Sequence, residues 1–323
     1  MPYPLPAIPH LPLTLILRAQ APARLPPFKG SMLRGAFGHA LRRTVCSMGP
    51  EQPCESCRLR RACVNTRIFE TFVEGTPPPL LRGLPTSPRP YVFEPGDGRR
   101  DFAPGDPLQF GLLLIGQAAE LQAYALLAVE RMAQAGLGSN RAPFALDRVE
   151  ARAPDGASVL LFAEGRPLGP AAVPPSLPST EGLPGSRATV HLHTPLRLKM
   201  QGGLAETVDF RDLTFAMVRR VLELAWFHVP GAGESIDWNF RPLLHLAEAV
   251  ACAPRLAWHD WERYSNRQQT KMTLGGLVGT LEIEGDLAPF APLLRAAEIL
   301  HVGKNTTFGL GKIEVEAGVR RLE

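Results

Sequence analysis

The chain has 323 residues, of which 45% are hydrophobic and 20% charged, and its net charge is +4. This length allows two ordinary domains of about 150 residues, each with its own core. No apolar run approaches the roughly 18 residues of a membrane span, and no basic patch followed by an apolar run indicates a signal peptide. We therefore expect a soluble cytoplasmic protein whose basic balance mildly favours a polyanionic partner.

The first predicted elements are a strand at 13–18 and a helix at 31–45. The apolar side of this helix carries Leu33, Phe37, Ala40, Leu41 and Val45. The opposite side carries Gly35, His39, Arg42 and Arg43. His39 therefore faces a cleft or water, either as a proton-transfer group or as a surface residue without function. Gly35 and Gly38 each cost about 1 kcal/mol relative to alanine in a helix, which suits a position where another backbone, such as RNA, approaches closely.

Four clustered cysteines follow the helix with the spacing C-x7-C-x2-C-x5-C; they are Cys46, Cys54, Cys57 and Cys63. Because the cytosol keeps thiols reduced and Cys-x-x-Cys suits tetrahedral geometry, this density indicates a metal rather than disulfides. We predict a structural Zn²⁺ held by all four thiolates. An iron–sulfur cluster and a metal-free loop are the alternatives. The loop also carries Arg58, Arg60 and Arg61, which either extend a basic surface or form a solvated face.

The rest of the first half predicts a long irregular, proline-rich insertion at 76–107, then strands and one helix. The strands are expected at 108–115, 146–152 and 159–162, and the helix at 120–135. Residues 167–185 are rich in proline and glycine, so they indicate a linker or a long hairpin loop beside a domain boundary.

The second half predicts a similar order of elements. Strands are expected at 188–194, 277–283 and 312–316, and helices at 212–227, 243–251 and 290–300. One face of the first of these helices would cover a sheet, and it carries Phe215, Val218, Leu222, Ala225 and Trp226. Cys252 follows the second helix among apolar residues and is expected to be a small core residue. The pattern alone supports an α+β fold, and two β-α-β-β-α-β units of the ferredoxin-like type fit it.

A glycine-rich loop at 301–312 carries the strongest indication of a ligand. Its residues of interest are Gly303, Lys304, Gly309, Gly311 and Lys312. Glycines can adopt backbone angles closed to other residues, so amide N–H groups can converge on a phosphate that the lysines also attract. The alternation that follows Gly311 predicts a strand rather than the helix of a nucleotide-binding P-loop. The alternative is a plain turn that carries lysines.

Residues 258–268 combine aromatic, basic and amide side chains. Arg263, Tyr264, Arg267 and Gln268 suit single-stranded or hairpin RNA, where phosphates are neutralised and bases stack. The structural alternative is a hairpin whose Trp258, Trp261 and Tyr264 fill the core. We expect the tryptophans to lie inside and the arginines to contact RNA.

Three segments together resemble a known family. They are Leu33–Arg42 followed by the four cysteines and Ile68-Phe69-Glu70, then Trp258–Gln268 followed by Met272–Gly279, and the loop from His301 to Lys312. This chain is similar there to the CRISPR repeat-processing endoribonucleases of the RAMP superfamily, in their cysteine-bearing branch. The resemblance implies two tandem ferredoxin-like (RRM-like) domains. Residues 1–180 would hold the cysteine knuckle (46–63) and the insertion (76–107), and residues 181–323 the glycine-rich loop.

The resemblance also implies a function: a metal-independent endoribonuclease that binds and cuts the repeat of precursor CRISPR RNA. The RNA's own 2′-hydroxyl would attack, leaving 5′-hydroxyl and 2′,3′-cyclic phosphate ends. His39 would be the general acid or base, with His301 as second candidate, and Lys29, Arg34, Arg42 or Lys304 would stabilise the phosphorane. The predicted RNA-binding residues are Lys29, Arg34, Arg42, Arg43, Arg263, Arg267, Gly303, Lys304, Gly309, Gly311 and Lys312.

The expected partners are precursor and processed CRISPR RNA, with other CRISPR effector subunits as further candidates and no membrane. The rival hypothesis is a non-catalytic RNA-binding subunit of an effector complex, which would use the same basic surfaces without cutting.

Overall fold

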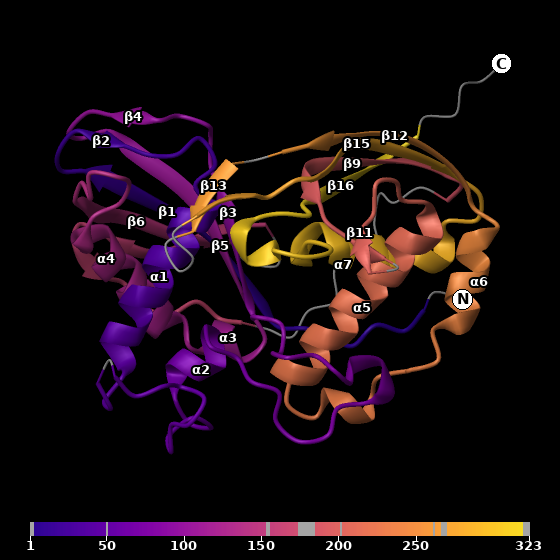
Figure 1. Cartoon of the computed structure of the whole chain (residues 1–323), viewed down its shortest axis with the longest axis horizontal. Helices are drawn as coiled ribbons and strands as arrows, with labels where there is room; N and C mark the ends of the chain where they lie inside the picture. Colours follow the sequence, from indigo (N-terminus) through magenta and orange to yellow (C-terminus); the bar gives the residue numbers. More distant parts are fainter. Residues whose placement is uncertain are drawn as a thin grey trace. The chain divides into compact units, whose positions relative to one another are not determined.

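The computed structural model describes residues 3–49, 51–152, 156–173, 185–200, 202–260, 262–265 and 270–318 (Figure 1). The chain forms two compact units. The N-terminal unit comprises Ile8–Ser176 and Glu223–Pro230, and the C-terminal unit comprises Met1–Ala7, Leu177–Leu222 and Gly231–Glu323. None of the described helices combines the length and apolar character needed to cross a membrane.

The N-terminal unit is built on one antiparallel sheet with the strand order β3-β5-β1-β6-β7-β8. Its main elements are β1 (His10–Ala19), α1 (Gly30–Val45), β3 (Tyr91–Pro95), β5 (Pro107–Ile115), α4 (Gln122–Ala135), β6 (Phe144–Arg152), β7 (Ser158–Ala163) and β8 (Arg166–Pro167). Strands β1, β3, β5 and β6 with helices α1 and α4 follow one another along the chain in the β-α-β-β-α-β order of a ferredoxin-like fold. Strands β7 and β8 extend the sheet beyond β6.

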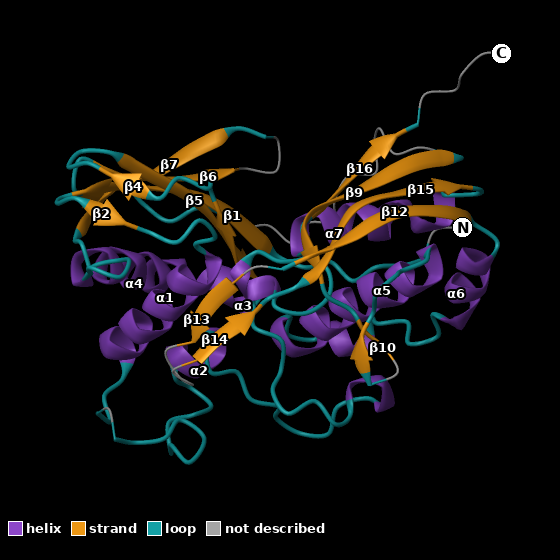
Figure 2. Ribbon diagram, turned by 45° about the horizontal axis from the view of Figure 1, so that its top comes forward, coloured by secondary structure: helices purple, strands orange, loops and turns teal. Residues whose placement is uncertain are grey.

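Alternation along β1 places the core on one face of this sheet. Leu11, Leu13, Leu15 and Leu17 are buried, whereas most of the residues between them are partly exposed. Burying one such side chain stabilises the fold by roughly 1.5–3 kcal/mol. Helices α1 and α4 cover this face (Figure 2) and contribute Leu33, Phe37, Val129 and Met132 to the same core.

The prediction of an irregular insertion at 76–107 was wrong in part. The segment contains β3, an edge strand of the sheet, and its Tyr91, Val92 and Phe93 are fully buried. Proline is tolerated at the ends of an edge strand, so Pro90 before β3 and Pro95 at its end do not prevent it. The smaller elements of this unit are β2 (Ala23–Arg24), α2 (Val64–Ile68), η1 (Pro79–Leu81), β4 (Asp101–Phe102) and α3 (Gln117–Glu120).

The C-terminal unit repeats the pattern with the antiparallel order β12-β15-β9-β16. Its main elements are β9 (Arg187–Leu196), α5 (Phe210–His228), α6 (Arg241–Glu248), β12 (Ala251–His259), β15 (Gly276–Glu284), α7 (Ala291–Leu300) and β16 (Ile313–Ala317). The smaller ones are β10 (Lys199–Met200), β11 (Gly203–Leu204), η2 (Ala232–Glu234), β13 (Glu262–Ser265), β14 (Thr270–Thr273), η3 (Ala288–Phe290) and η4 (Thr306–Phe308). The described structure is therefore a mixed α/β fold with antiparallel sheets.

Two sequence predictions needed correction here. The helix expected at 243–251 ends at Glu248, and Ala251 already begins β12, a strand that was not predicted. Alanine and proline make β12 a weak strand signal, and its pairing with β15 supplies the hydrogen bonds that the sequence does not reveal. Cys252 lies on this edge strand and is only partly buried, although burial raises the pKa of its thiol.

Helix α5 packs on the sheet largely as its periodicity predicts. Val218, Leu222 and Ala225 are buried, whereas Phe215 and Trp226 are partly exposed. The Arg220 Nε donates a hydrogen bond to the Leu300 carbonyl at 3.2 Å, which ties α5 to the end of α7. Of the expected linker at 167–185, residues 174–184 lie outside the described residues.

Candidate nucleic-acid interface

His39 lies on the exposed side of α1, as its helical periodicity predicts. Leu33, Phe37 and Leu41 are fully buried on the opposite side, so the imidazole of His39 faces solvent. Arg43, one turn further along, is also exposed. Residues four apart are neighbours on a helix surface, so these two side chains form a small basic face on α1.

The two glycines of α1 have different surroundings. A Cβ at Gly38 would lie 2.0 Å from Cζ of Phe69, so Gly38 makes room for that aromatic ring rather than for RNA. Nothing lies within 4 Å of a Cβ at Gly35. Phe69 therefore fills the space that RNA was expected to use at Gly38. At Gly35 that space is empty, so the expectation applies to Gly35 alone.

Two predicted RNA-binding arginines of α1 are engaged within the protein. The Arg34 guanidinium stacks on the ring of Phe69, with 4.2 Å between its Cζ and the ring centroid. The Arg42 Nη2 donates a hydrogen bond to the Gln52 carbonyl at 2.7 Å and so fastens the start of the cysteine loop to α1. Both side chains are partly buried.

Lys29 immediately precedes α1, and its side chain is completely buried. The Nζ donates a hydrogen bond to the Asp97 carbonyl oxygen at 2.6 Å and lies 3.8 Å from the Asp97 carboxylate. Burial lowers the pKa of the ammonium, and the nearby Asp97 opposes that shift. In this conformation Lys29 anchors the residue 97 segment and does not present its charge to a ligand.

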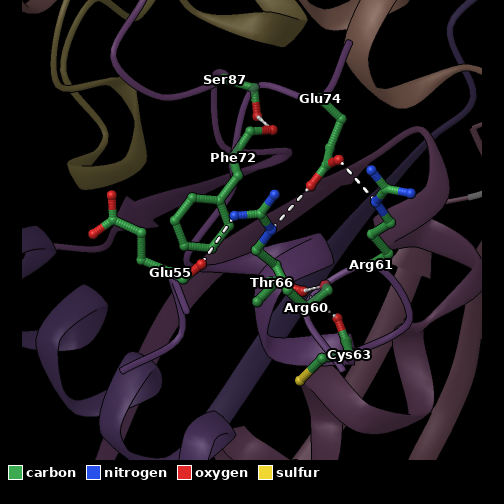
Figure 3. Close-up of polar contacts among 8 residues, drawn as sticks. All are labelled: Glu55, Arg60, Arg61, Cys63, Thr66, Phe72, Glu74 and Ser87. Carbon is green, nitrogen blue, oxygen red and sulfur yellow. Dashed lines mark hydrogen bonds and ion pairs between the residues drawn. The ribbon is translucent and has the colours of Figure 1, made fainter. Parts of the chain in front are cut away.

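Two arginines of the cysteine loop, Arg60 and Arg61, form ion pairs with the same acidic residue (Figure 3). Arg60 and Arg61 both place Nε 3.1 Å from a carboxylate oxygen of Glu74, and the Arg60 guanidinium lies 5.3 Å from the ring centroid of Phe72. Arg60 also donates to the Glu55 carbonyl at 2.9 Å. The contacts among these residues hold the loop against the chain that follows α2.

The four clustered cysteines are reduced and partly buried. Within the described ranges, no group of three or more His, Cys, Asp or Glu side chains is arranged to hold a metal ion. The thiol of Cys54 instead accepts a hydrogen bond from Nδ2 of Asn65 at 3.5 Å, and burial raises its pKa. The structure does not test the four-cysteine zinc centre, which stays a prediction.

His301, the second catalytic candidate, is buried. Its side chain is 1% exposed and Nδ1 lies 3.1 Å from the Leu310 carbonyl oxygen across the glycine-rich loop. Its backbone has φ 57° and ψ 159°, a conformation found almost exclusively in glycine. His301 therefore closes the base of the loop, where its ring cannot reach a solvent-borne phosphate.

The backbone amides of the glycine-rich loop are largely used inside the protein. The Gly309 amide donates to the Thr306 carbonyl, the Gly311 amide to the Pro195 carbonyl and the Lys304 amide to the Arg197 carbonyl. The Lys312 amide donates to the Thr194 hydroxyl at 2.9 Å. These four amides are therefore not available to an anion, contrary to the predicted phosphate cradle.

The glycines of this loop nevertheless have a clear steric role. A Cβ at Gly311 would lie 1.8 Å from the Val302 carbonyl oxygen, and one at Gly303 would lie 2.6 Å from the Arg197 carbonyl oxygen. Both have positive φ, 85° at Gly303 and 70° at Gly311. The loop thus folds tightly onto β9 and presents the exposed side chain of Lys304, while Lys312 is partly exposed.

The aromatic and basic segment after β12 is described only in part. Arg263 lies in β13, of whose side chains nothing is described, and Arg267 lies outside the described residues. Trp258 was expected in the core, yet it keeps 43% of its surface exposed. Arg197, which no sequence signal marked, donates a hydrogen bond to the Gly275 carbonyl beside it.

Two family models match the chain. The model described as AF_1859_N, N-terminal domain, matches residues 8–173, just over half of the chain. The model of the CRISPR-associated endoribonuclease Cas6 matches residues 190–313. Over these residues the chain is of the Cas6 type. Processing of CRISPR repeat RNA is the activity of that family, and the resemblance noted in the sequence is thereby confirmed.

Solved Cas6 structures share the fold. The product complex of the Thermus thermophilus Cas6 TTHB231 has a TM-score of 0.54 at 18% identity and covers 95% of this chain and 99% of its own. The product complex of the Cas6 TTHA0078 has a TM-score of 0.50 at 18% identity, covering 96% and 100%. A partial Cas6-RT-Cas1–Cas2 complex has a TM-score of 0.53 at 13% identity, covering 98% and 47%. Comparison with curated proteins found no match.

Proposed function

We propose that this Cas6-type protein binds the repeat of precursor CRISPR RNA and cuts it without a catalytic metal ion, through attack by the RNA's own 2′-hydroxyl. The 2′-oxygen forms a bond to the adjacent phosphorus while the bond from phosphorus to the 5′-oxygen breaks. The products are a 2′,3′-cyclic phosphate and a 5′-hydroxyl. The protein has only to align the attack, move two protons and stabilise the charge on the phosphorane.

His39 is the proton-transfer group in this proposal. A neutral imidazole accepts the 2′-hydroxyl proton, and an imidazolium gives a proton to the leaving 5′-oxygen; His39 performs one of these steps. The exposure of His39 on α1 is the observation that carries the assignment, because the rival His301 is buried with its Nδ1 at a backbone carbonyl.

Arg43 and Lys304 are the cations that we propose for binding the RNA backbone. Both are exposed, whereas three other predicted cations contact groups within the protein. Lys29 and Arg42 donate hydrogen bonds to the carbonyls of Asp97 and Gln52, and the Arg34 guanidinium lies over the ring of Phe69. Arg43 lies one helical turn from His39, so a phosphate held by its guanidinium is close to the imidazole. The proposed partner is CRISPR repeat RNA, and the Cas6-RT-Cas1–Cas2 complex suggests other CRISPR proteins as further partners.

Single-turnover cleavage of the repeat RNA from the protein's own locus tests this proposal. Loss of a general acid or base typically costs about a hundred- to ten-thousand-fold in rate, so His39→Ala should slow cleavage by that much while RNA affinity stays within a few-fold. A 2′-deoxy nucleotide just 5′ of the scissile phosphate should abolish cutting. Cleavage should persist in EDTA as long as any structural zinc is retained.

His301→Ala is the matched control for the assignment of the histidine. Full activity of His39→Ala would move the role to another residue. Strict Mg²⁺ dependence with a 3′-hydroxyl product would reject the mechanism. Tight repeat binding by wild-type protein without any cutting would instead establish the non-catalytic RNA-binding subunit.

A further inference from the structure

Trp258 is an exposed aromatic residue near the end of edge strand β12. It pairs in register with Leu277 of β15, which is 1% exposed, so both side chains lie on the same face of the sheet. Leu277 is covered there, whereas Trp258 at the sheet edge keeps 43% of its surface exposed. Tyr124 and Trp258 are the two aromatics among the large, well-exposed hydrophobic side chains of the described residues.

The indole ring of Trp258 is held in a fixed orientation. Its Nε1 donates a hydrogen bond to Oδ1 of Asp260 at 2.8 Å. A Cβ at Gly275 would lie 2.0 Å from that Oδ1 and 2.5 Å from the indole Nε1, so the ring edge lies directly against the glycine backbone. The polar edge of the indole is therefore satisfied inside the protein, and what it offers to solvent is apolar ring surface.

This aromatic residue is linked to the glycine-rich loop through Arg197. The Arg197 Nη1 donates a hydrogen bond to the Gly275 carbonyl, while its own carbonyl oxygen accepts the Lys304 amide at 2.9 Å. A chain of direct contacts thus runs from the indole through Gly275 and Arg197 to the backbone of Lys304. The exposed ring lies at the end of the sheet that also carries the exposed Lys304 side chain.

We propose that the face of Trp258 is a stacking platform for one unpaired nucleobase of the bound RNA. The inference rests on the proposed RNA-binding function and adds a base contact to the phosphate contacts of the lysine. A fixed, exposed aromatic ring at the same end of a sheet as an exposed lysine is a combination that suits single-stranded RNA, because every base has a π face and the RNA backbone carries phosphates. The exposed neighbours of Trp258 on β12 are small or polar; they are Ala253, Pro254, Arg255, Ala257 and His259. They do not form the wide apolar patch of a protein-docking surface, so Trp258 stands as a single aromatic platform.

Scanning the repeat RNA with a single 2-aminopurine at each unpaired position tests the platform. Stacking on an aromatic ring quenches this base's fluorescence. Wild-type protein and Trp258→Phe should quench it at the same position, and Trp258→Ala should restore the signal there and weaken RNA binding by about 5- to 150-fold. Leu246→Ala, which removes another exposed apolar side chain of the same unit, is the control and should leave affinity unchanged.

The variants distinguish the outcomes. Trp258→Phe loses the bond to Asp260 but keeps a ring, so equal weakening in the Phe and Ala variants would overturn stacking as the cause. Wild-type affinity of Trp258→Ala without any restored position would also refute the platform while leaving the proposed function intact. If wild-type protein failed to bind the repeat at all, the proposed function itself would fail, and the platform with it.

Discussion

At the scale of single residues, Tyr91 shows how burial changes the chemistry of one group. Its ring is fully buried among Phe37, Phe69 and Phe93, with centroid distances of 5.5, 6.1 and 5.8 Å. Burial raises the pKa of its hydroxyl to about 12, although the guanidinium groups of Arg34 and Arg89 oppose the shift. The folded protein therefore keeps this proton at a pH where the unfolded chain has released it.

This difference predicts an alkaline loss of stability. The unfolded tyrosine releases its proton near pH 10, so between pH 10 and 12 the folded state binds more protons and the free energy of unfolding falls as the pH rises. By pH 11, Tyr91 should have lowered the free energy of unfolding by roughly 1.4 kcal/mol. Urea denaturation at pH 9, 10 and 11 should show a smaller fall for Tyr91→Phe than for wild type. Burial also raises the pKa of Tyr3 to about 12, and both proteins retain Tyr3, so parallel curves would contradict the assignment to Tyr91.

At the scale of elements, the two glycines of α1 form a matched pair. Gly35→Ala gains about 1 kcal/mol of helix propensity without a steric cost, so it should raise the free energy of unfolding. Gly38→Ala places a Cβ into the ring of Phe69, and that ring is 7% exposed and covered by Arg34, so it has little room to move. This substitution should therefore lower the free energy of unfolding by about 1–3 kcal/mol. Urea denaturation measures both changes.

A smaller ring partner provides the check on this explanation. Gly38→Ala combined with Phe69→Leu should recover part of the loss, because the clash is removed. Stabilisation by both alanines would contradict the packing described for Gly38. Slower cleavage by a fully stable Gly35→Ala would instead identify Gly35 as a point where RNA approaches α1.

At the scale of the whole molecule, metal content decides what the cysteine loop does. We propose one structural Zn²⁺ at Cys46, Cys54, Cys57 and Cys63, although the described side chains are not gathered into a metal site. If it is bound, elemental analysis of purified protein should find about one zinc per chain, and Cys54→Ser should lose metal and solubility together. Brown protein absorbing near 400 nm would indicate an iron–sulfur cluster. Fully folded, metal-free protein would contradict both.

The regular elements were predictable where their periodicity is strong. The predicted strands include β1, β5, β9 and β15, and helical stripes predicted α1 and α5, because each helix has one buried and one more exposed side. Weak elements at sheet edges were missed: β3 lies among prolines and β12 is rich in alanine. Pairing with a central strand stabilises both, and pairing partners lie far away in sequence.

For the candidate site, the sequence by itself determined the exposed His39, the cysteine spacing and the glycine positions, because helix geometry and positive φ are local properties. The tertiary structure alone decided which charges stay free. The Lys29 side chain is buried and hydrogen-bonded to Asp97, and the ring of Phe69 packs against Gly38. Amides of the glycine-rich loop donate hydrogen bonds to carbonyls of β9, of the residue after it and of the loop itself. The exposure of Trp258 was decided in the same way. Burial and hydrogen bonding depend on which distant segments meet, and no local pattern carries that information.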